Sequence, residues 1–422
     1  MNYRMNSKPA QTIIYGWKRK WLDWRLKIHL MQIALSCYKS WHEAIQVVRS
    51  LVRFKQTVNG HKNLRRCART GSRYYFGPFI PGFPSSCFDR YIRTEFARFG
   101  NHHQPVNNLQ VLQIAITSRC PLRCEHCFEW DNLNKEDPFS TEQLKYIIRK
   151  FREAGLAQVH LTGGEPLIKM DRVCELIRDG APETEYYIYT SGCNLSLENA
   201  RRLKEAGATG VIISLDHHAE TEHNTFRGSE RAYEYAINGV RNSAKAGLVM
   251  ALSLCVTHRF LSLYNLDQYA RLAKKMGVSF VQLLEPKATG HYANSAVTLR
   301  PDEIQLLENF YQYINQSPRY RNYPVFLYPG YHQRRVGCMM AGNRILYIDS
   351  AGKIDACPFC QNHAADARTL LNGKLQVTDI YTGPCPEFGT GLKTFAAEKL
   401  PRQKTTSNSY HGELKRKSML SE

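Results

Sequence analysis

Between residues 111 and 314 the sequence alternates six times between a short apolar run and a longer amphipathic pattern. The apolar runs predict buried strands over residues 111–117, 157–162, 185–190, 211–216, 249–256 and 279–286. The amphipathic patterns predict helices over residues 141–154, 172–178, 197–206, 230–246, 266–276 and 301–314. This alternation predicts an α/β fold whose parallel sheet is built with right-handed crossovers.

Six such units are too few for a closed barrel of eight strands. An open partial barrel and a doubly wound sheet therefore both remain possible. In either architecture the loops that follow the strands carry the chemistry. The residues just after each predicted strand are thus the candidates for a functional site.

Three cysteines lie in the loop after the first predicted strand. The segment TSRCPLRCEHCFEW places Cys120, Cys124 and Cys127 in the spacing C-x-x-x-C-x-x-C. Three thiolates this close can each bind one iron of a four-iron cluster, which leaves the fourth iron open to a small molecule. The alternative is a zinc site, but structural zinc normally has four protein ligands. The spacing therefore favours an iron–sulfur cluster.

The rest of the sequence agrees with metal-binding cysteines. The chain has 13 cysteines, no apolar run long enough to span a bilayer, and no signal-peptide pattern in residues 1–20. We therefore expect a cytoplasmic protein. In that reducing compartment cysteines more often bind metal than form disulfides.

The cysteine triplet, its place after the first strand and the later segment HLTGGEPL together resemble the radical S-adenosylmethionine (radical SAM) superfamily. The resemblance covers residues 108–300 and implies a partial (β/α)6 TIM-like barrel. It implies that Cys120, Cys124 and Cys127 bind a 4Fe–4S cluster whose open iron is chelated by SAM. An electron from a reductase, ferredoxin or flavodoxin would cleave SAM, and the 5′-deoxyadenosyl radical would abstract hydrogen from the substrate. That first step needs no side-chain acid or base, so no catalytic residue is predicted.

The resemblance also implies which residues bind SAM. Gly163 and Gly164 would permit close backbone approach, and Glu165 would hold the amino group of SAM. His126, before the last cysteine of the triplet, occupies the place of an aromatic residue that contacts the adenine in the family. For the Gly163–Gly164 pair taken alone, a simple turn is the structural alternative.

Residues at the later strand ends complete the predicted SAM site. Ser191 and Ser214 are placed to hold the ribose and carboxylate, and Asp216 is placed to bind a hydroxyl. Arg227 is suited to neutralise a carboxylate. After the sixth strand, the candidate substrate contacts are Glu285, Lys287 and His291.

A second group of cysteines lies near the C-terminus: Cys338, Cys357, Cys360 and Cys385. Residues 344–349 and 353–357 predict a hairpin around Gly352. The pattern resembles the SPASM or shortened twitch extensions of radical SAM enzymes, which carry auxiliary 4Fe–4S clusters. Four cysteines are too few for two clusters and favour one, with Cys385 either its fourth ligand or not a ligand. A structural zinc is the alternative.

The N-terminal quarter carries most of the positive charge. The chain has a net charge of +20, and residues 1–100 hold 19 Lys and Arg against 4 Asp and Glu. Trp17, Trp21, Trp24 and Ile28 recur at helical spacing among these basic residues. The stripe could dock on the barrel, or lie on an anionic membrane and so suggest a lipid-like substrate. Nucleic acid is the third interpretation, but no recognition motif accompanies the charge.

The sequence thus predicts four segments. They are a basic, Trp-rich helical extension (1–105), a radical SAM core (106–300), an auxiliary-cluster domain (301–395) and a polar, disordered tail (396–422). The predicted function is radical SAM chemistry on a lipid, small molecule or peptide. Residues 1–105 show no clear three-strand pattern of the kind found in peptide-binding domains, which argues against a peptide. The rival hypothesis is a non-catalytic iron–sulfur or zinc protein recruited to a membrane or nucleic acid.

Overall fold

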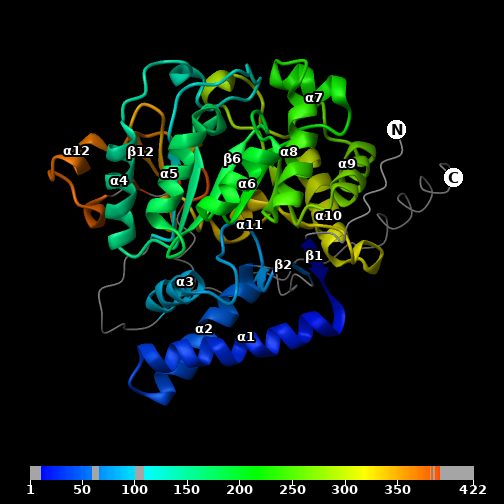
Figure 1. Ribbon diagram of the computed structural model, residues 1–422. Helices are drawn as coiled ribbons and strands as arrows, with labels where there is room; N and C mark the ends of the chain where they lie inside the picture. Colours follow the sequence, from blue (N-terminus) through cyan, green and yellow to red (C-terminus); the bar gives the residue numbers. More distant parts are fainter. Residues whose placement is uncertain (1–10, 59–65, 100–108, 381, 384, 390–422) are drawn as a thin grey trace.

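A ten-stranded sheet forms the centre of the computed structural model, which describes residues 11–58, 66–99, 109–380, 382–383 and 385–389 (Figure 1). The predicted tail from residue 396 lies outside the described residues. Six parallel strands follow one another across the sheet, and all six match the predicted runs. They are β4 (Val111–Ala115), β5 (Gln158–Thr162), β6 (Glu185–Thr190), β7 (Gly210–Ser214), β8 (Val249–Cys255) and β9 (Phe280–Leu284).

The predicted helices are also present, five of them between these strands and the sixth after β9. They are α4 (Thr141–Glu153), α5 (Met170–Gly180), α6 (Leu197–Ala206), α8 (Ala232–Ala246), α9 (Leu263–Met276) and α10 (Pro301–Gln316). The Ser140 side chain caps α4 by accepting a hydrogen bond from the backbone N–H of Gln143. An additional helix, α7 (Glu220–Arg227), precedes α8 and was not predicted.

The two faces of the sheet have different neighbours. Ile188, Val211 and Ile213 belong to the main core, which they share with the helices. Tyr187 and Ile212 point to the opposite face and form a separate apolar cluster with the N-terminal segment. Because the helices cover one face, the sheet is an open partial barrel and not a doubly wound sheet. The predicted fold class is confirmed.

Both edges of the sheet are extended by segments after residue 320. β10 (Val325–Leu327) pairs in parallel with β9, and β11 (Ile345–Ile348) pairs in parallel with β4. α11 (Pro329–Val336) links them. β11 then forms the predicted hairpin with β12 (Lys353–Asp355), followed by β13 (Ala365–Asp366) and α12 (Arg368–Leu371). The predicted boundary at residue 300 is therefore displaced, because α10 and β10 extend the barrel.

The N-terminal segment contains a small sheet as well as helices. β1 (Gln11–Ile14), β2 (Cys67–Thr70) and β3 (Arg73–Tyr75) form a three-stranded antiparallel sheet. The expectation that this segment contains no three-stranded sheet is therefore wrong. Its strands have only three or four residues, and more than fifty residues separate β1 from β2. Such a pairing leaves no local sequence pattern.

This small sheet covers the end of the barrel at which the strands begin. Ala68 and Tyr75 pack against Tyr187 and Phe280. The Gln11 side chain donates a 2.6 Å hydrogen bond to the carbonyl of Leu248, which precedes β8. The amino end of the barrel is thus closed, and the loops at the carboxyl end lie on the opposite side.

Three helices surround the small sheet: α1 (Gly16–Cys37), α2 (Trp41–Val58) and α3 (Ser86–Ala97). α1 packs on α2 and α3 through Leu22, Leu30, Ile33 and Ala34. Its tryptophans point outward instead, so of the three interpretations of the Trp stripe, docking on the barrel is contradicted. None of the helices in the described part of the chain is both long enough and apolar enough to cross a membrane.

Candidate active site

The loop that carries the cysteine triplet joins β4 to α4 and is fixed by backbone bonds to later loops. After β5, the N–H groups of Gly164 and Glu165 donate to the carbonyls of Thr117 (2.8 Å) and Arg119 (2.7 Å). At the end of α7, the carbonyl of Phe226 accepts from the N–H of Glu125 at 2.9 Å. The loop geometry therefore depends on contacts from several strand ends of the barrel.

The three thiols of this loop have the chemistry of cluster ligands. Cys124 is buried, while Cys120 and Cys127 are half-buried. Burial raises the pKa of Cys120 and of Cys127 to about 12, so both are protonated before iron binds. Structural zinc normally has four protein ligands, and this loop offers three thiols. This donor set fits a cluster better than one zinc ion.

Arg227 and Asp216 form a buried ion pair beside the triplet. Arg227 Nε donates to Asp216 Oδ2 at 2.6 Å, and Arg227 Nη1 lies 3.5 Å from the sulfur of Cys124. Burial raises the pKa of Asp216, but the Arg227 guanidinium, the nearby His126 and His223 rings and the Cys255 N–H together lower it more, so the carboxyl pKa lies below its ordinary value. The Cys255 N–H donates to the other oxygen of Asp216 at 2.8 Å. The pair places a fixed positive charge next to Cys124.

The Gly163–Gly164 turn leaves no room for side chains. A Cβ at Gly163 would lie 2.4 Å from the carbonyl oxygen of Thr117, and one at Gly164 would lie 2.3 Å from that of Arg119. Gly163 also has a φ of +151°. Only glycine allows the turn and the cysteine loop to approach so closely.

Glu165 connects the ends of β5 and β6. One carboxylate oxygen accepts hydrogen bonds from the Thr190 hydroxyl (2.7 Å) and the Leu167 N–H (3.1 Å). The other accepts from the hydroxyl (2.6 Å) and N–H (2.8 Å) of Ser191. Burial raises the pKa of Glu165, and these hydrogen bonds lower it less. The structure thus brings Glu165 and Ser191 into direct contact with each other, while Ser214 lies half-buried at the end of β7.

Two aromatic stacks lie on the cysteine loop. His126 stacks on Phe226 with ring centroids 4.7 Å apart, and its Nδ1 atom is buried without a hydrogen-bond partner. Burial lowers the pKa of His126 to about 4, so the ring is neutral. Trp130 stacks on His291 at 3.7 Å, and the His291 N–H donates to the Cys127 carbonyl at 2.9 Å. Sequence reasoning missed Trp130 and Phe226, although both lie close to the motifs it used.

The other two candidate substrate residues have partners of their own. Glu285 accepts hydrogen bonds from the Tyr328 hydroxyl at 2.6 Å and from Arg334 at 2.7 Å. Lys287 forms an ion pair with Glu387 at 2.6 Å. These residues tie the end of β9 to the C-terminal segment.

The four C-terminal cysteines come together in one small cluster. Cys338 and Cys385 are buried beside Cys357 and Cys360, and the sulfurs of Cys360 and Cys385 lie 3.9 Å apart. The loop with Cys357 and Cys360 rests on the triplet loop, because the Gln361 side chain donates to the Phe128 carbonyl at 3.1 Å. The two cysteine groups therefore lie on neighbouring loops.

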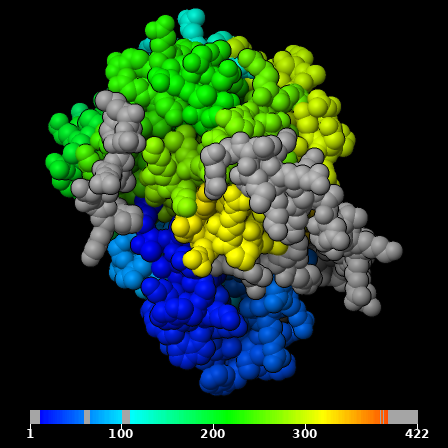
Figure 2. All heavy atoms as spheres, turned by 90° about the vertical axis from the view of Figure 1, so that its right-hand side faces the viewer, coloured from blue at the N-terminus to red at the C-terminus, as the bar shows by residue number. Residues whose placement is uncertain are grey.

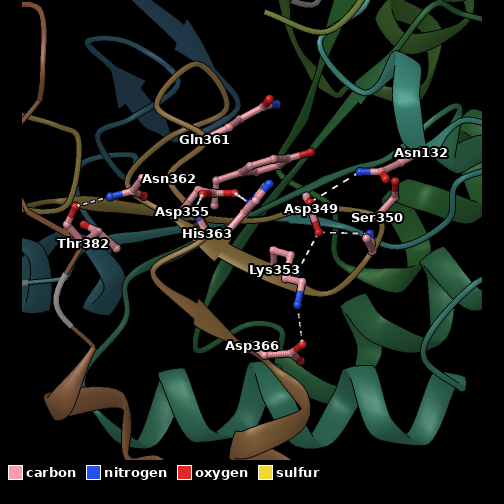
Figure 3. Close-up of polar contacts among 12 residues, drawn as sticks. Asn132, Asp349, Ser350, Lys353, Asp355, Gln361, Asn362, His363, Asp366 and Thr382 are labelled. Atoms are coloured by element: carbon pink, nitrogen blue, oxygen red, sulfur yellow. Dashed lines mark hydrogen bonds and ion pairs between the residues drawn. The ribbon is translucent and has the colours of Figure 1, made fainter.

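Acidic residues hold the hairpin that leads to these cysteines (Figure 3). Asp349 Oδ1 accepts from the backbone N–H of Ala351 (2.9 Å) and Lys353 (2.7 Å) across the β11–β12 turn. Asp355 Oδ1 accepts from the N–H of His363 at 2.6 Å. Asp349, Asp355 and His363 lie close together, and their hydrogen bonds shape the turn and the loop that carries Cys357 and Cys360.

Comparison with known proteins agrees with this geometry. Residues 114–262 match the radical SAM superfamily. The PqqA peptide cyclase of Streptomyces rochei is 28% identical over 293 residues, which cover 67% of this chain and 76% of that protein. The GTP 3′,8-cyclase of Aliarcobacter butzleri is 29% identical over 206 residues, 46% of this chain and 61% of that protein. The chain thus spans less than two thirds of the length of the second relative.

Solved structures share the fold. SuiB of Streptococcus suis bound to its precursor peptide SuiA is similar with a TM-score of 0.51 and 15% identity, covering 77% of each chain. SuiB bound to SAM gives a TM-score of 0.50 at 17% identity, covering 64% of this chain and 65% of SuiB. The triplet at the end of β4 and the sequence match therefore lead to the same conclusion. Residues 114–262 thus carry the radical SAM domain, and the core of enzymes with this domain binds a 4Fe–4S cluster and SAM.

Proposed function

We propose that this chain uses SAM to take a hydrogen atom from a peptide. The main observation behind this proposal is the position of the cysteine loop. Backbone hydrogen bonds to three later loops of the barrel hold it at the carboxyl end of β4. When bound there, the cluster and SAM supply a 5′-deoxyadenosyl radical to an unactivated C–H bond. The protein contributes position and the exclusion of water.

The residues divide into ligands and positioning residues. Cys120, Cys124 and Cys127 hold the cluster, and Arg227 supplies a positive charge beside it for the anionic cluster and the SAM carboxylate. Asp216 orients Arg227 through their buried ion pair.

Other residues line or shape the SAM pocket. Gly163 and Gly164 form the backbone surface next to the cluster, and Glu165 with Ser191 keeps that turn in place. The neutral ring of His126 would contact the adenine, and Ser214 would offer a hydroxyl to the ribose.

The C-terminal cysteines hold an auxiliary 4Fe–4S cluster. Cys338, Cys357, Cys360 and Cys385 are near enough to serve together, and their loop lies on the triplet loop. An external reductase, ferredoxin or flavodoxin supplies the electron.

A peptide is the substrate class that the comparisons favour. The relative with the greater coverage of this chain is a peptide cyclase. The small sheet found in the N-terminal segment also removes the sequence argument against a peptide.

Deuterium transfer tests this proposal. Reduced protein with SAM is mixed with an extract of the source cells grown in deuterated medium, and 5′-deoxyadenosine is analysed by mass spectrometry. We expect deuterium in 5′-deoxyadenosine, because the hydrogen abstracted from the substrate ends there. Protease treatment of the extract should abolish this transfer. Transfer that survives complete proteolysis would contradict a peptide substrate, while leaving the SAM reaction intact.

A further inference from the structure

α1 presents large apolar side chains to solvent along one line. Trp17, Trp21, Trp24 and Ile28 form this tryptophan stripe, and the exposed fractions of the three tryptophans are 74%, 49% and 60%. With 3.6 residues per turn, the four side chains fall within about 60° of the helix circumference. The buried residues of α1 lie on the opposite side, against α2 and α3. The helix is therefore already anchored, and the stripe is not needed for folding.

Basic residues flank the stripe on both sides. Lys18 and Arg25 lie along one side, and Lys20 and Lys27 lie along the other, as the same helical spacing requires. The only acidic residue of α1, Asp23, is paired with Arg19. The Arg25 guanidinium lies 4.8 Å from the Trp21 ring centroid. The stripe therefore has no acidic neighbour on α1 that would repel an anionic surface.

We propose that the tryptophan stripe binds the surface of an anionic lipid bilayer, with α1 lying parallel to the membrane. Tryptophan rings favour the interface between headgroups and acyl chains, and the two rows of Lys and Arg match the negative headgroups. A single exposed aromatic residue would not define such a surface. Four apolar side chains in line, bordered by cations on both sides, define a surface of this kind. This inference does not depend on the proposed reaction.

The arrangement also fixes the orientation of the enzyme. The small sheet covers the amino end of the barrel. α1 lies at this same end of the molecule, as Figures 1 and 2 show, where the blue N-terminal helices lie beneath the barrel. The cysteine loop lies at the opposite, carboxyl end of the strands. The active site then opens away from the bilayer. Membrane binding would serve to place the enzyme, and the substrate would arrive from the aqueous side and not as a lipid within the membrane.

Vesicle sedimentation with the full chain tests this proposal. The protein should sediment together with vesicles of mixed phosphatidylglycerol and phosphatidylcholine. It should not sediment with vesicles of pure phosphatidylcholine. Replacing Trp17, Trp21 and Trp24 together by alanine should lower the bound fraction about tenfold. The exposed Tyr264→Ala variant is the matched control, since Tyr264 is 67% exposed on the barrel. Its binding should equal that of the wild type.

Two double charge-reversal variants distinguish electrostatic attraction to anionic lipid from nonspecific adsorption to vesicles. Lys20→Glu with Lys27→Glu should weaken binding to the anionic vesicles, and added salt should have the same effect. Lys245→Glu with Lys275→Glu, which makes the same charge change on exposed barrel residues, should not. Equal sedimentation of the tryptophan variant and the wild type would overturn the proposal. So would equal binding to neutral vesicles, or binding to an RNA homopolymer without binding to anionic vesicles.

Discussion

Replacing Cys124 by alanine is expected to remove the first cluster and to abolish reductive cleavage of SAM. The Cys124 thiol is buried, and its sulfur lies 3.5 Å from Nη1 of Arg227. With two of three thiols left, the loop cannot hold a four-iron cluster with one open iron. Iron and sulfide content should fall by about half, because the auxiliary cluster that we propose for the C-terminal cysteines would remain.

The matched control for this variant is Cys174→Ala. Cys174 is a fully buried cysteine of α5 in the main core. The control should keep its iron and its SAM cleavage, with at most a small loss of stability. Cleavage of SAM by the Cys124→Ala protein at the wild-type rate would contradict the assignment of the triplet.

The second large effect is expected for Gly164→Ala. The added methyl group would lie 2.3 Å from the carbonyl oxygen of Arg119 and 2.7 Å from that of Ser118. Backbone atoms cannot swing aside as flexible side chains do, so the two loops must separate. Overpacking of this kind costs about 1–3 kcal/mol of stability. Because SAM would bind where these loops meet, the rate of SAM cleavage should fall at least about 100-fold.

Gly77→Ala provides the control for that substitution. Its methyl group would meet only the Leu327 side chain at 3.5 Å, an ordinary van der Waals contact. Urea unfolding and the initial rate of 5′-deoxyadenosine formation should be measured for both variants. If Gly164→Ala keeps the wild-type rate, the turn does not shape the SAM site.

The barrel could be predicted from sequence because its strands are continuous apolar runs. A strand such as β8 is buried on both faces over all seven residues, and that pattern is visible locally. β11 could not be placed in the same way. It pairs with β4, more than two hundred residues earlier, and such long-range pairing leaves no trace in a local pattern.

The site shows the same division between local and distant information. The spacing of the triplet and of the GGEP segment is local, so their residues were found. Asp216 and Arg227 were both singled out, but their mutual ion pair depends on α7, whose polar sequence did not predict a helix. α1 has apolar residues on more than one side, and periodicity alone favoured the tryptophans over Leu22 and Leu30 as the buried face.

The most direct test of the central claim is the fate of SAM on the reduced wild-type protein. Anaerobically reconstituted protein is mixed with SAM and a chemical reductant, and the products are quantified by chromatography. We expect 5′-deoxyadenosine and methionine in equal amounts, formed only when the reductant is present. Intact SAM recovered from reduced protein that carries its iron–sulfur clusters would contradict this claim.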